Sequence, residues 1–305
     1  MTAGRALLLA VPLVGLLELG LHLYFARRPP AFEDWAQVRD PVTAFADASV
    51  PVIVAPSWAE PLARQVLGDE RMPIAHVARP DVTRFEAALE LSILGERAPE
   101  LAGWTEEARE VHGKFLLRKL RNPSFRRVIT DFVERARPPF ATVFTTAPRE
   151  ACRWTDRAKT ISGYLGGNPT FPRERFECPA GPFFNVGATV IADQDFRARR
   201  CLWSHPPKEG EIVTRFDDVA LGDRIEGHGG LSWMIERERR GAPIVLRVRV
   251  DGEEVGKVEH RDGQGWAPFE IPLGAHAREE HAAVEIGVSS PNHQHRHFCF
   301  EATSR

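Results

Sequence analysis

The sequence lacks the short motifs by which many enzymes are recognised. It contains no P-loop, no glycine fingerprint for dinucleotides, no H-E-x-x-H zinc motif and no Ser-His-Asp order of a hydrolase. An enzyme can lack all of these, but their absence favours a binding, accessory or structural protein, so no catalytic residue is assigned.

Excess positive charge is also missing. The net charge is -2 and the pI is near 6.6, whereas nucleic-acid-binding domains usually carry a basic excess. Only five of the 40 basic residues are lysine, a preference for arginine that a GC-rich genome explains better than phosphate recognition. We therefore expect no nucleic-acid partner.

No cysteine belongs to a C-x-x-C pair, so the spacing of a zinc ribbon is absent. The four cysteines are Cys152, Cys178, Cys201 and Cys299, all in the second half of the chain. Outside the cytoplasm they would suit two disulfides in one of three connectivities, and in a reducing compartment they would be buried thiols.

The longest apolar run, Ala6–Phe25, contains only two strongly polar residues, Glu18 and His22. As a helix it would be roughly 30 Å long, the thickness of a bilayer core, so residues 1–28 are predicted to be a single transmembrane anchor. A cleaved signal peptide and a buried helix are the alternatives. The short head before the run favours a signal anchor with an extracytoplasmic body, periplasmic or on the cell surface of a bacterium, although arginines flank both ends.

Glu18 and His22 are four residues apart and therefore share a helix face. Ionisable groups at membrane depth usually face protein or water, which predicts a membrane-protein partner. The alternative is that Glu18 is protonated or lies near the interface.

Residues 29–137 are predicted to be a connector and a small mixed α/β region. A β-branched run at 50–55 precedes Ser57 and Glu60, whose spacing is that of a capping box at a helix start. Trp58 and Glu60 are candidates for lining a ligand cleft at the end of this strand, although a packed Trp58 and a capping Glu60 are the simpler alternative. Apolar residues at helical spacing predict further helices over 81–94 and 124–136.

Residues 138–305 are predicted to be a β-sandwich. Apolar residues alternate over 244–250 and 282–289, and turn residues separate these runs from further strands expected over 254–260 and 266–273. The last strand is expected over 293–302. The predicted fold class is thus α+β, with an N-terminal helix, a small mixed region and a C-terminal antiparallel, jelly-roll-like sandwich.

Three short stretches, Phe216–Val219, Val250–Gly252 and Gly265–Ile271, carry a resemblance. Over residues 211–305 the chain resembles galactose-binding-like jelly-roll modules, which commonly bind sugars or serve as structural appendages. No sugar-contacting residue of that family can be carried over. Trp233 and Trp266 are the candidate platforms on which a sugar ring would stack, the alternative being that both are core.

His293, His295 and His297 alternate along the last predicted strand, so their side chains would share one face. Imidazole suits zinc, copper, iron or nickel. Because the three span roughly 13 Å along a strand, we predict that His295 and one neighbour would bind a metal together with His260 or Asp262 from an adjacent strand. The alternative is a solvent-facing stripe and no cofactor.

Together these features predict a membrane-anchored, extracytoplasmic binding or accessory protein of the cell envelope. Its ligand would be a glycan, a membrane-protein partner, or both. A metal-dependent enzyme that uses the histidine-bearing strand and a purely structural surface protein are the alternatives.

Overall fold

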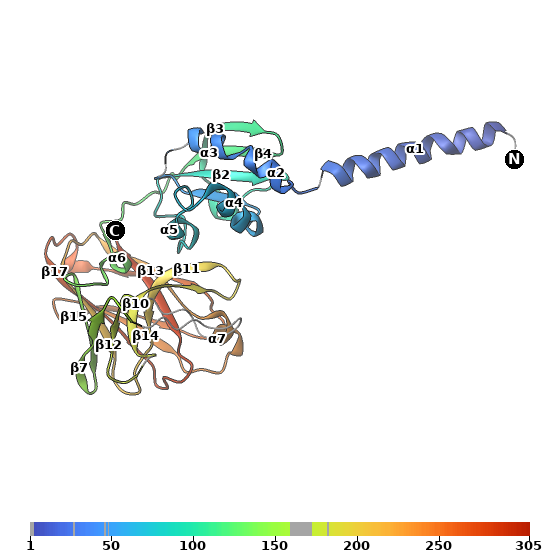
Figure 1. Cartoon of the computed structure of the whole chain (residues 1–305). Helices are drawn as coiled ribbons and strands as arrows, with labels where there is room; N and C mark the ends of the chain where they lie inside the picture. Colours follow the sequence, from blue (N-terminus) through green and yellow to red (C-terminus); the bar gives the residue numbers. More distant parts are fainter. Residues whose placement is uncertain (1–2, 27, 46, 48, 159–172, 182) are drawn as a thin grey trace. The chain divides into compact units, whose positions relative to one another are not determined.

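The computed structural model describes residues 3–26, 28–45, 47, 49–158, 173–181 and 183–305. The chain forms two compact units (Figure 1). The smaller unit comprises Met1–Val77 and Phe85–Phe125, and the larger comprises Ala78–Arg84 and Arg126–Arg305.

A four-stranded sheet, in the order β1-β2-β4-β3, is the centre of the smaller unit as far as it is described. β1 runs parallel to β2, and the other pairs are antiparallel. Trp35 and Phe115 pack edge to face in the core beside this sheet, with 4.9 Å between their ring centres. The elements of this unit are α1 (Ala3–Ala26), α2 (Phe32–Ala36), α3 (Arg39–Phe45), β1 (Val52–Ala55), η1 (Ser57–Ala59), α4 (Glu60–Leu67), α5 (Ile74–Val77), β2 (Ala87–Ile93), η2 (Pro99–Leu101), β3 (Thr105–His112) and β4 (Phe115–Arg121).

Helix α1 contains the whole apolar run from which a helix was predicted. Among the residues that the structure describes, however, no helix is long and apolar enough to cross a membrane. The predicted transmembrane anchor is therefore not supported by the structure.

The predicted helix over 81–94 is wrong, because this segment forms β2. β2 lies between β1 and β4, and its residues from Ala88 to Ile93 are all buried. Leu89 packs in the core, while the carboxylate of Glu90, also buried, pairs with Arg118 Nε at 2.7 Å. A strand buried on both faces shows little polar alternation, so the helical spacing in this segment was coincidental.

Two further local predictions are also wrong. Over 124–136 the structure has β5 (Thr130–Asp131) and α6 (Phe132–Arg135), so only one helical turn forms, capped by Asp131 Oδ1. The capping box does not form, since Ser57 lies inside η1 and α4 begins after Ala59 without a side-chain cap.

The larger unit is a sandwich of two antiparallel sheets. Its described residues form an eight-stranded sheet in the order β16-β13-β18-β11-β10-β9-β8, with β5 also paired to β18, and a six-stranded sheet in the order β15-β14-β17-β12-β6-β7 (Figure 1). The elements after β5 and α6 are β6 (Ala141–Thr146), β7 (Arg149–Ala151), β8 (Arg153–Thr155), β9 (Arg175–Glu177), β10 (Asn185–Ala192), β11 (Ala198–Ser204), β12 (Ile212–Val219), β13 (Arg224–Leu231), α7 (Trp233–Glu238), β14 (Ile244–Val250), β15 (Glu253–His260), β16 (Ala267–Pro272), η3 (Gly274–His276), β17 (Ala282–Ser289) and β18 (Phe298–Ser304).

The inward-facing residues of both sheets share one hydrophobic core. Phe300 on β18 and Val284 on β17 are both completely buried in it. All four cysteines are paired, Cys152 with Cys178 and Cys201 with Cys299. The predicted sandwich and the predicted disulfide bonding are thus present in the structure.

The last strand begins later than predicted. β18 starts at Phe298, and His295, with a φ of 56°, lies in a turn before it. The three histidines at 293, 295 and 297 therefore do not alternate on one strand face, because they precede β18 and the left-handed conformation of His295 interrupts an extended backbone.

Candidate functional site

A pocket with a volume of about 350 Å³ lies against the eight-stranded sheet. It is formed around the central part of β13, where this strand pairs with β16 on one side and β18 on the other. All lining residues belong to the larger unit, and we call this site the β13 pocket. They are Asp81, Thr83, Arg126, Glu226, Gly227, His228, Pro268, Phe269, Glu270, Glu301 and Arg305.

Gly227 allows an aromatic ring to lie close to the sheet in the β13 pocket. A Cβ at this position would collide with the carbonyl of Glu301 and lie 2.7 Å from Cζ of Phe269. Phe269 pairs with Gly227 across the β13–β16 register and is half-buried. The pocket therefore presents part of an aromatic ring over the backbone of β13.

The charged side chains of the β13 pocket are paired. Arg126 lies 2.7 Å from Oε1 of Glu226, and Arg305 lies 3.3 Å from Oε2 of the same carboxylate. Glu270 pairs with Arg224 at 2.7 Å. Since acidic and basic groups compensate one another, the pocket suits a neutral, hydrogen-bonding ligand better than an ion.

A buried acid and a histidine lie at one side of this pocket. Nδ1 of His228 is 2.9 Å from Oε1 of Glu301, and its Nε2 is 3.5 Å from Asp81. Burial raises the pKa of Glu301, although the hydrogen bond with His228 acts in the opposite direction. The ring of His228 stacks in parallel on Trp266, with 6.0 Å between the ring centres.

The raised pKa of Glu301 predicts a pH-dependent effect of Glu301→Gln. The folded chain holds the Glu301 proton at pH values where the unfolded chain has released it, so the associated stability is present below the ordinary pKa of 4.5. It is lost as the pH rises through the raised value. Because glutamine does not ionise, the variant should gain stability relative to wild type as the pH rises above the ordinary pKa of 4.5, as measured by urea unfolding.

The control for this experiment is Glu259→Gln, since Glu259 is exposed on β15. Its difference from wild type should stay nearly constant across the same pH range. A difference for Glu301→Gln that is equally constant would show that the carboxyl ionises at its ordinary pKa.

A second hollow, of about 550 Å³, lies beside α6 and β8 in the larger unit. Trp154 lines it and packs edge to face on Phe176, 4.8 Å away. Trp154 is thus already packed against a neighbouring ring. The charged residues that line this hollow, Arg137 and Arg200 among them, are more numerous than the apolar residues.

The four side chains predicted to contact a ligand are not brought together. Trp58 is 61% exposed in η1, and the half-buried Glu60 is the first residue of α4, in the smaller unit. Trp233 lies on α7 against Phe196, with 5.1 Å between the ring centres. Only Trp266 is near the β13 pocket, where it lies behind His228.

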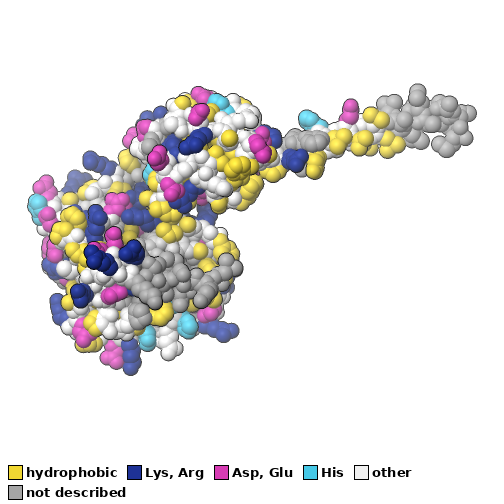
Figure 2. Space-filling view, viewed as in Figure 1, with side chains coloured by type: hydrophobic (Ala, Val, Ile, Leu, Met, Phe, Trp, Pro, Cys, Tyr) yellow, Lys and Arg dark blue, Asp and Glu magenta, His cyan; other side chains and the backbone are white. Residues whose placement is uncertain are grey.

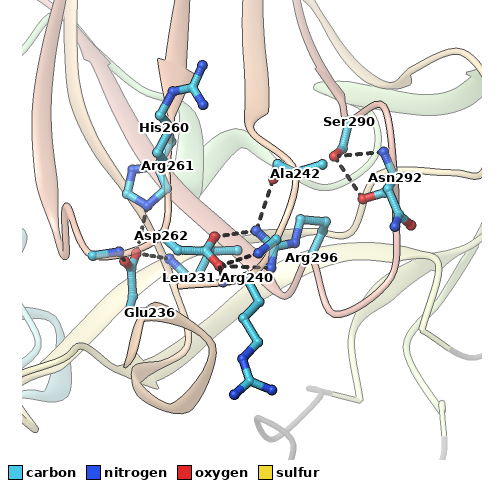
Figure 3. A network of polar contacts seen from close by, with 12 residues as sticks. Leu231, Glu236, Arg240, Ala242, His260, Arg261, Asp262, Ser290, Asn292 and Arg296 are labelled. Atoms are coloured by element: carbon cyan, nitrogen blue, oxygen red, sulfur yellow. Dashed lines mark hydrogen bonds and ion pairs between the residues drawn. The ribbon is translucent and has the colours of Figure 1, made fainter. Parts of the chain in front are cut away.

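The two cross-strand groups predicted to complete a metal site have other partners (Figure 3). His260 Nε2 is 2.6 Å from Oε1 of Glu236, and both side chains are buried. Asp262 accepts from the guanidinium of Arg296 and from the backbone N–H of Gly241 at 2.8 Å. The predicted ligand set does not assemble, because no group of three ligand atoms within 4.8 Å of one another in the described part of the chain contains His260 or Asp262.

The structure instead brings a different histidine to that segment. The rings of His205 and His297 are 5.7 Å apart between centres, and those of His205 and His293 are 6.3 Å apart. His295 is exposed, and its ring centre is 6.4 Å from that of His297. We call these four residues the histidine cluster. Burial lowers the pKa of both His205 and His297 to about 4, so these two are neutral at pH 7.

Charges of both signs are interspersed on the face of the larger unit shown in Figure 2, where neither sign covers a continuous area. The expectation that nucleic acid is not a partner stays a prediction. Glu18 and His22 are both exposed on α1, about one helical turn apart. Their predicted role in binding a membrane partner stays a prediction.

No protein-family model and no curated protein sequence matches the chain. A similar solved structure is that of CBM51 from Clostridium perfringens GH95 in complex with methyl-galactose, with a TM-score of 0.27, 12% identity, and coverage of 39% of this chain and 81% of that chain. The tandem CBM51 modules of a family 98 glycoside hydrolase from Streptococcus pneumoniae have a TM-score of 0.29 and 11% identity, with coverage of 63% and 55%. CBM51-2 with GlcNAc and INT domains from Clostridium perfringens ZmpB has a TM-score of 0.27 and 9% identity, with coverage of 66% and 40%.

These three similar structures contain carbohydrate-binding modules. The chain spans about half or less of the second and third of them. At TM-scores below 0.3 these structures do not identify a ligand of this chain.

Sequence reasoning missed most residues of this pocket. Phe269 lies three residues after Trp266, inside a stretch on which the family resemblance rests. Because side chains alternate along a strand, Phe269 would be expected on the sheet face opposite to that of Trp266. Arg126 and Glu226 gave no local signal, since they meet only through the fold of the larger unit.

Proposed function

We propose that the larger unit is a carbohydrate-binding module that holds a neutral glycan in the β13 pocket. The observation that carries this proposal is the half-buried ring of Phe269 beside the paired groups of Glu226 and Arg126 in one cavity. Sugars combine hydroxyl groups with apolar C–H faces. Carboxylates accept from hydroxyls, guanidinium groups donate to them, and an aromatic ring packs on the C–H face.

The size and charge of the pocket support the same ligand class. About 350 Å³ is at the lower end of the roughly 300–1,000 Å³ of small-molecule sites, which suits a terminal sugar or a short oligosaccharide. Because Arg126 and Arg305 already neutralise Glu226, an uncharged sugar would not leave a buried charge without its partner.

The test is glycan binding by the purified full chain, its Phe269→Ala variant and its Glu226→Gln variant on an array of neutral oligosaccharides. Methyl-galactose and GlcNAc, which occupy two of the similar modules, are suitable first ligands. Loss of a buried aromatic contact should weaken binding at least about tenfold. Glu226→Gln keeps the shape of the side chain and should weaken binding through the lost charge-assisted hydrogen bonds.

The matched control is Phe196→Ala, which removes an aromatic ring that is 61% exposed and packs on Trp233. This variant should bind the same glycans as wild type. Loss of binding in Phe196→Ala with full binding in Phe269→Ala would transfer the site to α7 and refute the assignment to the β13 pocket.

We further propose that the larger unit functions in an extracytoplasmic compartment of the cell envelope, as a binding or accessory protein. The two disulfides, Cys152–Cys178 and Cys201–Cys299, support this location, because disulfides persist in oxidising compartments and are rare in the cytosol. Thiol labelling of the protein in intact cells tests it. Complete protection of all four cysteines until a reductant is added is the expected result, and free thiols would contradict the proposed location.

A further inference from the structure

The pairing of β11 with β18 brings two histidines together. Leu202 pairs with Phe300 and Trp203 with Cys299 in the antiparallel register. Continuing this register by two residues places His205, just after β11, opposite His297, just before β18. The disulfide between Cys201 and Cys299 joins the same two strands, so the backbone positions of these histidines are fixed by regular structure.

His205 has a defined tautomer. Its Nδ1 lies 2.9 Å from the carbonyl oxygen of Pro206, and a carbonyl oxygen only accepts, so Nδ1 carries the proton and Nε2 retains its lone pair. A hydrogen bond from one ring nitrogen to a backbone carbonyl is how metal-binding histidines are commonly oriented. The residue is only 5% exposed, so its ring is held by packing as well.

We propose that His205, His293 and His297 bind one divalent transition-metal ion of the zinc type. Two imidazoles on a tetrahedral zinc, each with a bond of roughly 2.0–2.1 Å, have ring centres on the order of 5–6 Å apart. The ring centre of His205 is 5.7 Å from that of His297 and 6.3 Å from that of His293, close to this range. The ligand nitrogens of the three rings do not all lie within 4.8 Å of one another as the rings stand in the described structure. Binding therefore requires the rings of His293 and His297 to turn towards the lone pair of His205, and no hydrogen bond among the described residues holds either ring.

The surroundings of the histidine cluster suit such an ion. Phe184 packs against the rings of both His205 and His293, and Trp203 packs against His205 and His297, so apolar surface encloses the site. The positive charge of the neighbouring Arg296 is neutralised, because its guanidinium pairs with Asp262 (Figure 3). Imidazole ligands without a carboxylate favour zinc, copper or nickel over calcium or magnesium.

Another group of ligand atoms provides the strongest competitor. Oxygen and nitrogen atoms of Asp251, His276 and Glu279 already lie within 4.8 Å of one another, the one such group found in the described part of the chain. Asp251 is exposed and two of the three ligands are carboxylates, which suits harder ions better than zinc. His276→Ala is therefore the control that separates the two sites.

The experiment is zinc analysis of the full chain, purified without a histidine tag, loaded with Zn²⁺ and then dialysed. Wild type and His276→Ala should retain about one zinc per chain, whereas His293→Ala and His205→Gln should retain little. Zinc at about a hundredfold excess over its dissociation constant should raise the Tm of wild type by roughly 5–10 °C and leave that of His293→Ala unchanged.

His293 is only half-buried at the edge of the cluster, so His293→Ala tests the site even if the buried His205→Gln variant does not fold. Wild type without retained zinc, or His293→Ala that retains as much zinc as wild type, would overturn the proposal. Loss of zinc in His276→Ala alone would assign the ion to the competing group and overturn it equally.

Discussion

Replacing Arg296 with methionine should destabilise the larger unit by about 3–5 kcal/mol, the usual cost of leaving one partner of a buried ion pair alone. The side chain of Arg296 is 2% exposed and that of Asp262 is 4% exposed. Two nitrogens of the guanidinium bind the two oxygens of the carboxylate, and Nη1 also donates to the carbonyl of Ala242 at 3.0 Å (Figure 3). In the variant, the Asp262 charge would stay buried without its partner.

The pKa of Asp262 points to the same conclusion. Burial alone would raise the pKa of this carboxyl, but the hydrogen bonds from Arg296 and from the backbone N–H of Gly241 keep it below its ordinary value. The folded state therefore favours the charged carboxylate, and removal of Arg296 takes away the main stabilising contact of that charge.

Urea unfolding of Arg296→Met beside Arg278→Met measures this effect. Arg278 pairs with Asp223 at 2.8 Å, but their side chains are 78% and 53% exposed, so its loss should cost less than about 1 kcal/mol. Adding Asp262→Asn to Arg296→Met should recover part of the lost stability, because asparagine carries no charge and can still accept from Gly241. Equal costs for the two arginine variants would show that the Arg296–Asp262 pair is not a buried contact.

Removal of the Cys201–Cys299 disulfide should lower the free energy of unfolding by a similar amount. The two cysteines are 98 residues apart in the sequence, whereas Cys152 and Cys178 are 26 apart. In the chain-entropy description a disulfide stabilises more when it closes a longer loop, about 4.7 kcal/mol for the first pair and about 3.5 kcal/mol for the second. The first pair also joins two neighbouring strands of the eight-stranded sheet.

Guanidinium unfolding of the two double variants, Cys201→Ala/Cys299→Ala and Cys152→Ala/Cys178→Ala, compares these effects directly. The first should unfold at the lower denaturant concentration. If the second were the less stable of the two, loop length would not be the deciding factor, and the local packing around Cys152 would have to account for the difference.

The strands of the sandwich could be predicted because each packs only one face on the core. β14 is the clearest case, since buried residues alternate with half-buried ones along its whole length from Ile244 to Val250. In β2 the same reasoning failed. Glu90 and Ser92 are as buried as the neighbouring Leu89 and Leu91, so the polar residues that usually mark the solvent face do not mark it there.

The β13 pocket could not be predicted for a different reason. Its residues come from separate segments, with Asp81 before the sandwich, Glu226 on β13, Phe269 on β16 and Glu301 on β18. They meet only because β13 pairs with both β16 and β18 in one register. Such long-range pairing depends on the packing of the whole core, so it cannot be predicted from a short stretch of sequence.

The histidine cluster shows the same limit at a smaller scale. The spacing of His293, His295 and His297 predicted a metal-binding strand, but the turn at His295 interrupts that strand. The histidine that completes the cluster, His205, is some ninety residues earlier. Its proximity follows from the β11–β18 pairing, which the spacing of histidines could not reveal.

The most direct test of the central claim is a crystal structure of the full chain with the neutral oligosaccharide that binds it most tightly on the array. We expect a sugar ring over Phe269 in the β13 pocket, with hydroxyl groups at hydrogen-bonding distance from Glu226 and Arg126. A sugar bound beside Trp233 and Phe196, or in the hollow lined by Trp154, with the β13 pocket empty, would contradict it.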